Sequence, residues 1–353
     1  MKHVLILIIL LLLTLSGVQA QSTIWSTEKA NAWYKKQGWV RGSNFQPSTA
    51  INQLEMFQAA TFDPKTIDKE LGWAEGLGLN AMRVYLHHMA WTTDKAGFKN
   101  RLGQYLQIAN KHGIKTILVF FDDCWNDEYH PGKQPAPKPG IHNSGWVRDP
   151  GTMILTHPDS LKVLESYVKD VMTTFKNDDR ILLWDLYNEP GNNQYFDKSL
   201  PLLKSVFGWA RAVNPSQPIS AGVWNWDDKF TELNKFQEEN SDVITYHNYR
   251  YIDNHQQRIN SLRKYNRPLI CTEYMARRNG SLFQTIMPML KQENVGAINW
   301  GFVSGKTNTI YAWGTPMPDG KEPELWFHDI YRTDGTPFSE DEVSKIKALT
   351  GKK

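Results

Sequence analysis

The sequence predicts one α/β domain, a single (β/α)8 TIM barrel with long loops after its third and eighth strands. Short apolar runs alternate with helix-like segments from about residue 37 onward, as in parallel strands joined by crossover helices. Eight such runs occur, which is the number of strands that closes this barrel. An open doubly wound sheet has the same alternation and is the alternative.

The expected strands are apolar runs bounded by turn residues, and in chain order they cover residues 38–42, 81–86, 116–121, 181–187, 219–223, 243–246, 269–272 and 297–302. The expected helices cover residues 64–77, 98–112, 158–175, 200–213, 229–238, 256–265 and 282–292. A last helix begins near Ser339, with which Glu342 would form a capping box. Proline after Asp63 and His157 marks helix starts, and Gly78 and Gly113 mark helix ends.

The first 20 residues have the pattern of a signal peptide. A basic start precedes an apolar stretch from Val4 to Leu13, and Val18-Gln19-Ala20 offers small residues for cleavage. We therefore expect export to the periplasm or the medium, with residues 21–353 forming the barrel. A retained membrane anchor is the alternative, although the apolar stretch is short for a bilayer span.

Composition excludes several classes of function. The formal charge of +3 is too close to balance to suggest a nucleic-acid partner, and no further apolar stretch suggests a membrane. Cys124 and Cys271 are the only cysteines, so neither a disulfide scaffold nor a cysteine-rich metal site is expected, and we expect both to be unpaired. The 14 tryptophans are unusual, because an indole either fills a core or stacks on a sugar ring.

Polar residues gather at the ends of the expected strands. Active sites of barrel enzymes lie at the carboxyl ends of the strands, so these side chains should share one face. Glu189 and Glu273 are the most informative, because an ionisable residue that closes a buried apolar run is costly unless a site uses it. The others are Arg83, His87, His88, Asn188, His247, Tyr249 and Trp300. The two long loops, residues 123–156 and 304–337, add Trp125, Trp146 and Trp313 on the same face.

Together these residues resemble the signature of clan A glycoside hydrolases, closest to the family 5 cellulases and mannanases. The matching residues are Asn188-Glu189-Pro190 after Trp184, His247-Asn248-Tyr249, Thr272-Glu273, Trp300 and Arg83. The resemblance implies hydrolysis of β-linked oligo- or polysaccharides with retention of configuration. It assigns Glu189 as acid/base and Glu273 as nucleophile. It also implies that Asn188 contacts the sugar 2-hydroxyl, that Tyr249 hydrogen-bonds the nucleophile, and that Trp300 lies under the sugar.

One position departs from this family. Its members commonly carry a histidine near the end of the third strand, where this chain has Asp122, Asp123, Cys124 and Trp125. Asp122, His87 or His88 could take that place, and we expect His88 and Trp125, with Arg83 and His247, to contribute to substrate binding.

Retention requires two carboxyl groups roughly 5–5.5 Å apart, against about 6.5–9.5 Å for inversion. With Glu273 ionised nearby, like-charge repulsion should hold the proton on Glu189. Three alternatives stay open: a transglycosylase, a noncatalytic glycan-binding barrel, and a metal-dependent hydrolase. The sequence contains no His-Glu-x-x-His or calcium-loop motif, so we expect no metal or other cofactor, and we expect a monomer.

Overall fold

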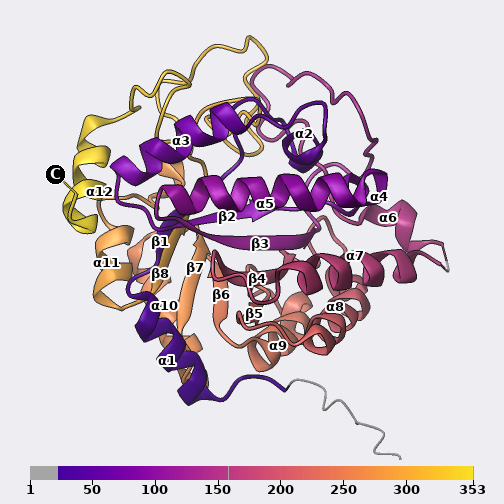
Figure 1. The fold of residues 1–353 in the computed structure, drawn as a ribbon. Coiled ribbons are helices and arrows are strands. Elements are labelled where there is room, and N and C mark those ends of the chain that lie inside the picture. Colours follow the sequence, from indigo (N-terminus) through magenta and orange to yellow (C-terminus); the bar gives the residue numbers. More distant parts are fainter. Residues whose placement is uncertain (1–22, 158, 353) are drawn as a thin grey trace, which may run out of the picture.

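The computed structural model describes residues 23–157 and 159–352, and it forms a barrel of eight parallel strands surrounded by helices (Figure 1). The expected signal peptide lies outside the described residues. The strands are β1 (Arg41–Asn44), β2 (Ala81–Tyr85), β3 (Lys115–Asp122), β4 (Ile181–Asn188), β5 (Ile219–Ser220), β6 (Ile244–His247), β7 (Leu269–Glu273) and β8 (Gly296–Asn299). The predicted (β/α)8 barrel is therefore confirmed.

The sheet runs in the order β5-β4-β3-β2-β1-β8-β7-β6, and Val223 joins its two edges. The Val223 amide donates to the carbonyl oxygen of Thr245 at 3.1 Å, and the His247 amide donates to that of Val223 at 2.9 Å. The strand predicted over residues 219–223 is thus shorter than expected, because its second half pairs through a single bridge.

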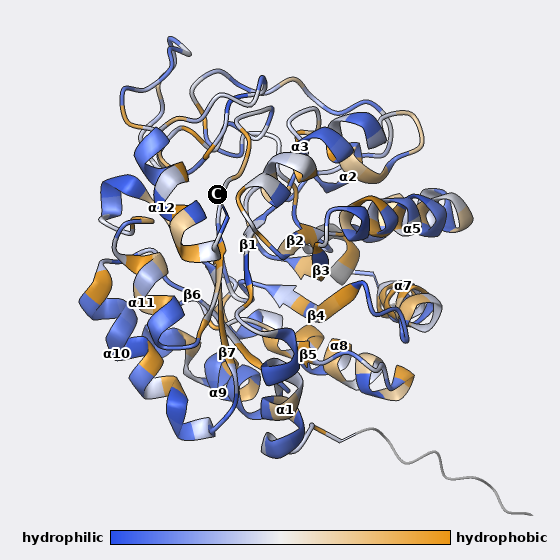
Figure 2. Ribbon diagram, turned by 60° about the vertical axis from the view of Figure 1, so that its left-hand side comes forward, coloured by the Kyte–Doolittle hydropathy of each residue, from blue (hydrophilic) through white to orange (hydrophobic). Residues whose placement is uncertain are grey.

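The larger helices alternate with the strands and cover the outside of the barrel. They are α3 (Pro64–Gly76), α5 (Lys95–Lys111), α7 (Ser160–Phe175), α8 (Leu200–Val213), α9 (Thr231–Asn240), α10 (Ile252–Leu262), α11 (Ile286–Gln292) and α12 (Glu340–Thr350). Figure 2 shows hydrophobic and hydrophilic residues sharing these helices, as expected when one side packs on a sheet. In the described part of the chain, no helix is both long and apolar enough to cross a membrane.

Some local predictions were wrong at element boundaries. The first strand starts at Arg41 rather than at residue 38, because Gly38 has a φ of 69° and ends helix α1 (Thr27–Gln37). At the last helix the Ser339 hydroxyl accepts from the Glu342 amide, as predicted. The Glu342 carboxylate instead binds Arg277 at 2.6 Å, so it is engaged by a tertiary contact.

Several short elements were not predicted. They are α1, α2 (Gln53–Phe57), α4 (His88–Thr93), α6 (Gly151–Leu155) and the 3-10 turns Phe196–Ser199 and Arg277–Asn279. Two more 3-10 turns, Asp228–Phe230 and Arg263–Tyr265, lie at ends of the helices predicted over residues 229–238 and 256–265. Helix α1 lies at the end of the barrel opposite the long loops (Figure 1). Its Tyr34 is buried with Val40, Ile117 and Leu183 at the start of the barrel interior, so α1 closes that end.

Two long connections cover part of the other end. We call residues 123–150, between β3 and α6, the β3 loop, and residues 300–339, between β8 and α12, the β8 loop. They lie side by side at the top of Figure 1. The Asn143 amide of the first donates to the Thr307 carbonyl of the second at 2.8 Å, and the Met317 amide donates back to the Gly140 carbonyl at 3.0 Å.

Candidate active site

Glu189 and Glu273 meet at the carboxyl ends of β4 and β7. One carboxylate oxygen of each and a ring nitrogen of His247 all lie within 4.8 Å of one another. The two side chains come from strands on opposite sides of the barrel, separated in the sheet order by several other strands. Barrel closure therefore brings together two acids that are remote in sequence.

Glu273 is surrounded by hydrogen-bond donors. Its Oε1 accepts from Arg83 Nη1 at 2.7 Å and from the Tyr85 hydroxyl at 2.8 Å, and its Oε2 accepts from the Tyr249 hydroxyl at 2.6 Å. Burial raises the pKa of the Tyr249 hydroxyl well above its usual value, so this group remains a donor at neutral pH. These three donors fix the orientation of both carboxylate oxygens of Glu273.

Arg83 is held inside the barrel by contacts other than the one to Glu273. Its Nε donates to Asp185 at 2.9 Å, its Nη2 donates to Asn188 Oδ1 at 2.7 Å, and its Nη1 also reaches Asn44 Oδ1 at 2.9 Å. Asp185 and Arg83 are fully buried, so removing either one would leave the other as an uncompensated buried charge. Since Asn188 Oδ1 accepts from Arg83, its amide nitrogen is turned toward Asp122 Oδ1, at 2.9 Å.

Glu189 has a different environment. Its Oε1 lies 2.8 Å from His247 Nδ1, and its Oε2 accepts from Asn192 Nδ2 at 2.6 Å and from the Cys124 thiol at 3.2 Å. Burial raises the pKa of the Glu189 carboxyl, and the donors Cys124 and Asn192 partly oppose that change. Burial, rather than the like-charge repulsion that we expected, is the largest cause. The residue has a φ of 43°, an uncommon conformation for a glutamate, which aims its side chain across the barrel mouth.

His247 lies between the two acids. Its Nδ1 is 2.8 Å from Glu189 Oε1 and 3.4 Å from Glu273 Oε2. Burial lowers the pKa of His247 to about 4, so the ring is neutral at pH 7. Its Nε2 has no hydrogen-bond partner among the described residues.

A cavity of about 320 Å³ opens above these side chains. Trp300 and Trp146 form part of its wall, with ring centroids 5.7 Å apart at 69°. Trp125, which we expected to bind substrate, also lines it and is 38% exposed. Trp224 and Trp313 also line the cavity, whereas Trp91 is buried against α7.

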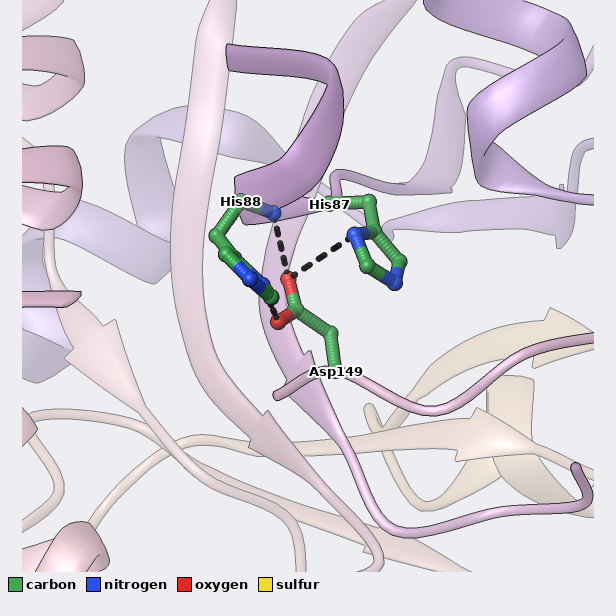
Figure 3. Close-up of side chains that lie close together, drawn as sticks. All are labelled: His87, His88 and Asp149. Carbon is green, nitrogen blue, oxygen red and sulfur yellow. Dashed lines mark hydrogen bonds and ion pairs between the residues drawn. The ribbon is translucent and has the colours of Figure 1, made fainter. Parts of the chain in front are cut away.

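The structure does not bring His88 into this cavity. Figure 3 shows His87 and His88 beside Asp149, which arrives from the β3 loop. His88 Nδ1 lies 2.5 Å from Asp149 Oδ1, its backbone amide donates to Oδ2 at 2.7 Å, and all three residues are buried. His87 Nε2 contacts the carbonyl of Arg148 at 2.8 Å. The histidines therefore anchor the β3 loop to the end of β2.

Asp122 ends β3, where the resemblance led us to look for the counterpart of a histidine. Its Oδ1 accepts from Asn188, its Oδ2 accepts from Trp146 Nε1 at 2.7 Å, and it lines the cavity. Burial raises the pKa of Asp122 to about 7. Of the three residues that we considered for that place, it is the one at the cavity.

Sequence reasoning missed Tyr85, Cys124, Asn192 and His142, which contact the acids or line the cavity. Tyr85 had a usable signal, because it follows Arg83 by two positions and so points to the same side of the strand. The cysteines Cys124 and Cys271 are both free, as predicted.

Among the residues that the structure describes, two groups of side chains have the spacing to hold a metal ion: His87, His88 and Asp149, and Glu189, His247 and Glu273. In the first group His87 Nδ1 accepts from the Met89 amide, while His88 Nδ1 is bound by Asp149. The prediction of no metal cofactor stays a prediction.

Comparison with known proteins agrees with the resemblance read from the sequence. Residues 45–305 match the cellulase family, glycosyl hydrolase family 5. A tomato (Solanum lycopersicum) protein, mannan endo-1,4-beta-mannosidase 1, is 29% identical over 119 residues, which cover 30% of this chain and only 26% of the relative.

Two solved structures illustrate the similarity in fold. The endo-beta-1,4-mannanase of Thermotoga petrophila has a TM-score of 0.58 and 13% identity, with 90% of this chain and 77% of that chain covered. The exo-beta-1,4-mannosidase of Opitutaceae bacterium strain TAV5 has a TM-score of 0.63 and 17% identity, with coverage of 89% and 60%. At such identities the structures support the barrel fold alone, whereas the family match covers most of the sequence. This chain belongs to glycosyl hydrolase family 5.

Proposed function

We propose that this protein is a retaining glycoside hydrolase that cleaves β-linked oligo- or polysaccharides. The observation that carries the proposal is the approach of Glu189 and Glu273, which have carboxylate oxygens within 4.8 Å of each other. Retaining enzymes hold their two carboxyl groups about 5–5.5 Å apart, against about 6.5–9.5 Å in inverting enzymes, so this close approach favours retention. Membership of a glycosyl hydrolase family supports the same reaction class.

In this proposal Glu273 is the nucleophile. Arg83, Tyr85 and Tyr249 fix both of its oxygens, so it can attack the anomeric carbon without reorganisation. The attack forms a covalent glycosyl-enzyme, and the C–O bond to the leaving sugar breaks.

Glu189 acts as acid and then as base. Because burial raises its pKa, it holds a proton that it can deliver to the leaving oxygen as the bond breaks. Once Glu273 is bonded to the sugar its negative charge is gone, and ionised Glu189 can take a proton from the attacking water. His247 orients Glu189 through the 2.8 Å contact and remains neutral.

The sugar being cleaved would lie between the acids and Trp300. Its ring can stack on the exposed part of Trp300, and we propose that Asn188, which lines the cavity beside Glu189, contacts the 2-hydroxyl group. We propose Trp125 as a further contact, since it lines the cavity. Arg83 and Tyr249 act on the sugar indirectly, through Glu273.

We propose a β-1,4-linked, mannose-containing glycan as the substrate class. The tomato relative and both bacterial structures carry mannanase or mannosidase names. The aromatic lining of the cavity suits the apolar faces of a hexopyranose ring, which every candidate glycan presents.

The test is a substrate panel with the Glu273→Gln variant. Glutamine keeps the shape of the side chain and removes the nucleophile. Among mannan, cellulose, xylan and aryl β-glycosides, hydrolysis of each substrate that the wild type cleaves should therefore fall by several orders of magnitude. Glu239→Gln, on the exposed surface of α9, is the matched control and should leave the rates unchanged. Equal rates for wild type and Glu273→Gln would end the assignment.

We also propose that residues 1–20 direct export and that the processed protein acts as a monomer on extracellular or periplasmic glycan. Expression of the full chain, followed by mass spectrometry of the exported protein, should locate the new amino terminus after Ala20. Retention of the full mass in the membrane fraction would instead support the anchor alternative.

A further inference from the structure

The cavity is covered on one side by the β3 and β8 loops. Besides the two backbone bonds described above, Asn308 Nδ2 donates to the carbonyls of Lys138 at 2.8 Å and Ile141 at 3.1 Å. These contacts join the loops across the mouths of β1 and β2, which lie between β3 and β8 in the sheet. The sector of the barrel from β8 to β3 is therefore roofed.

Side chains of the two loops pack together under this cover, and we call His142, Trp125 and Trp313 the wall. His142 is buried, its Nδ1 contacts the Tyr311 carbonyl at 2.8 Å, and its Nε2 accepts from Trp313 Nε1 at 3.2 Å. Trp125 packs on the His142 ring with centroids 5.3 Å apart. Trp313 in turn packs edge-on against Tyr249 at 4.7 Å, so the wall reaches the residue that binds Glu273. Each polar atom of the His142 ring is satisfied, which favours one fixed arrangement.

The opposite side of the cavity is continuous with a second hollow. Asn192, Asn193 and Trp224 line both the cavity and an adjoining groove of about 360 Å³. The groove extends over Phe196 and Asn225, in the connections that follow β4 and β5. The described residues thus give the cleft one walled end and one end that continues along the surface.

The two ends have different roles in the reaction. An acid must lie beside the leaving oxygen, so the leaving part of the substrate extends past Glu189, on the β4 side. That is the side of the groove. The glycone, the part that becomes bonded to Glu273, consequently points its non-reducing end toward the wall of His142 and Trp313.

From this geometry we propose that the protein acts from the non-reducing chain end and releases one sugar at a time. This inference rests on the proposed function and adds the direction and position of cleavage. A polysaccharide cannot extend through the wall, so only a terminal sugar fits above Glu273. The rest of the chain lies in the groove, where Trp224 offers a partly buried aromatic face.

The experiment uses β-1,4-linked mannopentaose whose reducing end has been converted to the alditol. At low conversion, wild-type protein should yield free mannose and the tetrasaccharide alditol, seen by anion-exchange chromatography. Early mannobiose, mannotriose or short alditols would overturn the inference, because they require internal cleavage. Loss of all hydrolysis, on this and on the matched gluco- and xylo-pentaoses, would instead contradict the proposed function.

A pair of glycine variants tests the wall itself. A Cβ on Gly140 would lie 1.7 Å from the Met317 carbonyl oxygen, so Gly140→Ala must push the two loops apart. Gly132→Ala is the matched control, because Gly132 is in the same loop with a positive φ but its Cβ would meet nothing within 4 Å. We expect early mannobiose and longer products from Gly140→Ala and only mannose from Gly132→Ala. If a folded Gly140→Ala protein retains mannose as its only early product, the wall is not what confines cleavage to the chain end.

Discussion

The hydrogen bond from Asn192 to Glu189 provides a sensitive test of the proposed acid. Asn192 Nδ2 donates to Glu189 Oε2 at 2.6 Å and favours the ionised carboxylate. Asn192→Ala removes this donor, so the pKa of Glu189 should rise further. A hydrogen bond to a charged group contributes about 1.5–3 kcal/mol. Because one pKa unit corresponds to about 1.4 kcal/mol, the expected rise is about one unit and at most about two.

The assay is the pH dependence of kcat/KM, which reports the pKa values of the free enzyme. Glu189 must be protonated to act as the acid, so activity falls as the pH rises through its pKa. The alkaline limb should therefore move to higher pH in Asn192→Ala. Asn193→Gly is the matched control, because Asn193 also lines the cavity but its amide donates to the Asp123 carbonyl, and glycine tolerates its φ of 52°. A limb that stays in place, or moves to lower pH, would refute Glu189 as the acid.

Three further predictions concern the surroundings of the site and the core. Cys124→Ala should move the same limb upward, since the thiol also donates to Glu189, whereas Cys124→Ser keeps a donor and should move it less; equal shifts would contradict that contact. Asp149→Asn should lower the free energy of unfolding in urea by about 1–3 kcal/mol, because it removes an acceptor from buried His88; an unchanged midpoint would show that the anchor adds no stability. Burial raises the pKa of Glu70 to about 7 from 4.5, so the folded state binds its proton more tightly than the unfolded state. The contribution of the protonated Glu70 carboxyl to the free energy of unfolding is present below about pH 4.5 and is lost as the pH rises through 7. Glutamine stays neutral at every pH, so Glu70→Gln should be more stable than wild type at pH 8 by about 3 kcal/mol. Equal unfolding free energies at pH 8 would contradict this.

The fold was largely predictable because buried parallel strands have an unmistakable composition. Ile181–Asn188 and Leu269–Glu273 are apolar runs that end in polar residues, so both their positions and their active ends could be inferred. Helix α1 could not be, because only Ala30 and Tyr34 are buried along it and most of its surface is polar. Its role in closing the barrel depends on tertiary contacts of these few residues, which give the α1 sequence little hydrophobic periodicity.

The site was predictable where strand geometry dictates direction. Glu189, Glu273 and Arg83 belong to or directly follow strands, whose alternation determines which side chains face inward. His88 was misplaced because the chain turns into α4 immediately after β2, and that turn aims the side chain at Asp149. The contact between His142 and Trp313 joins two irregular loops that are remote in sequence, and no local pattern encodes such a pairing.

The most direct test of the account is the configuration of the first product. Proton NMR, recorded within minutes of adding enzyme to an aryl β-mannoside or to mannopentaose, distinguishes the β-anomer from the α-anomer before mutarotation. Carboxylates as close as those of Glu189 and Glu273 predict the β-anomer, through a covalent intermediate on Glu273. Initial release of the α-anomer would contradict the double displacement and, with it, the roles given to both acids.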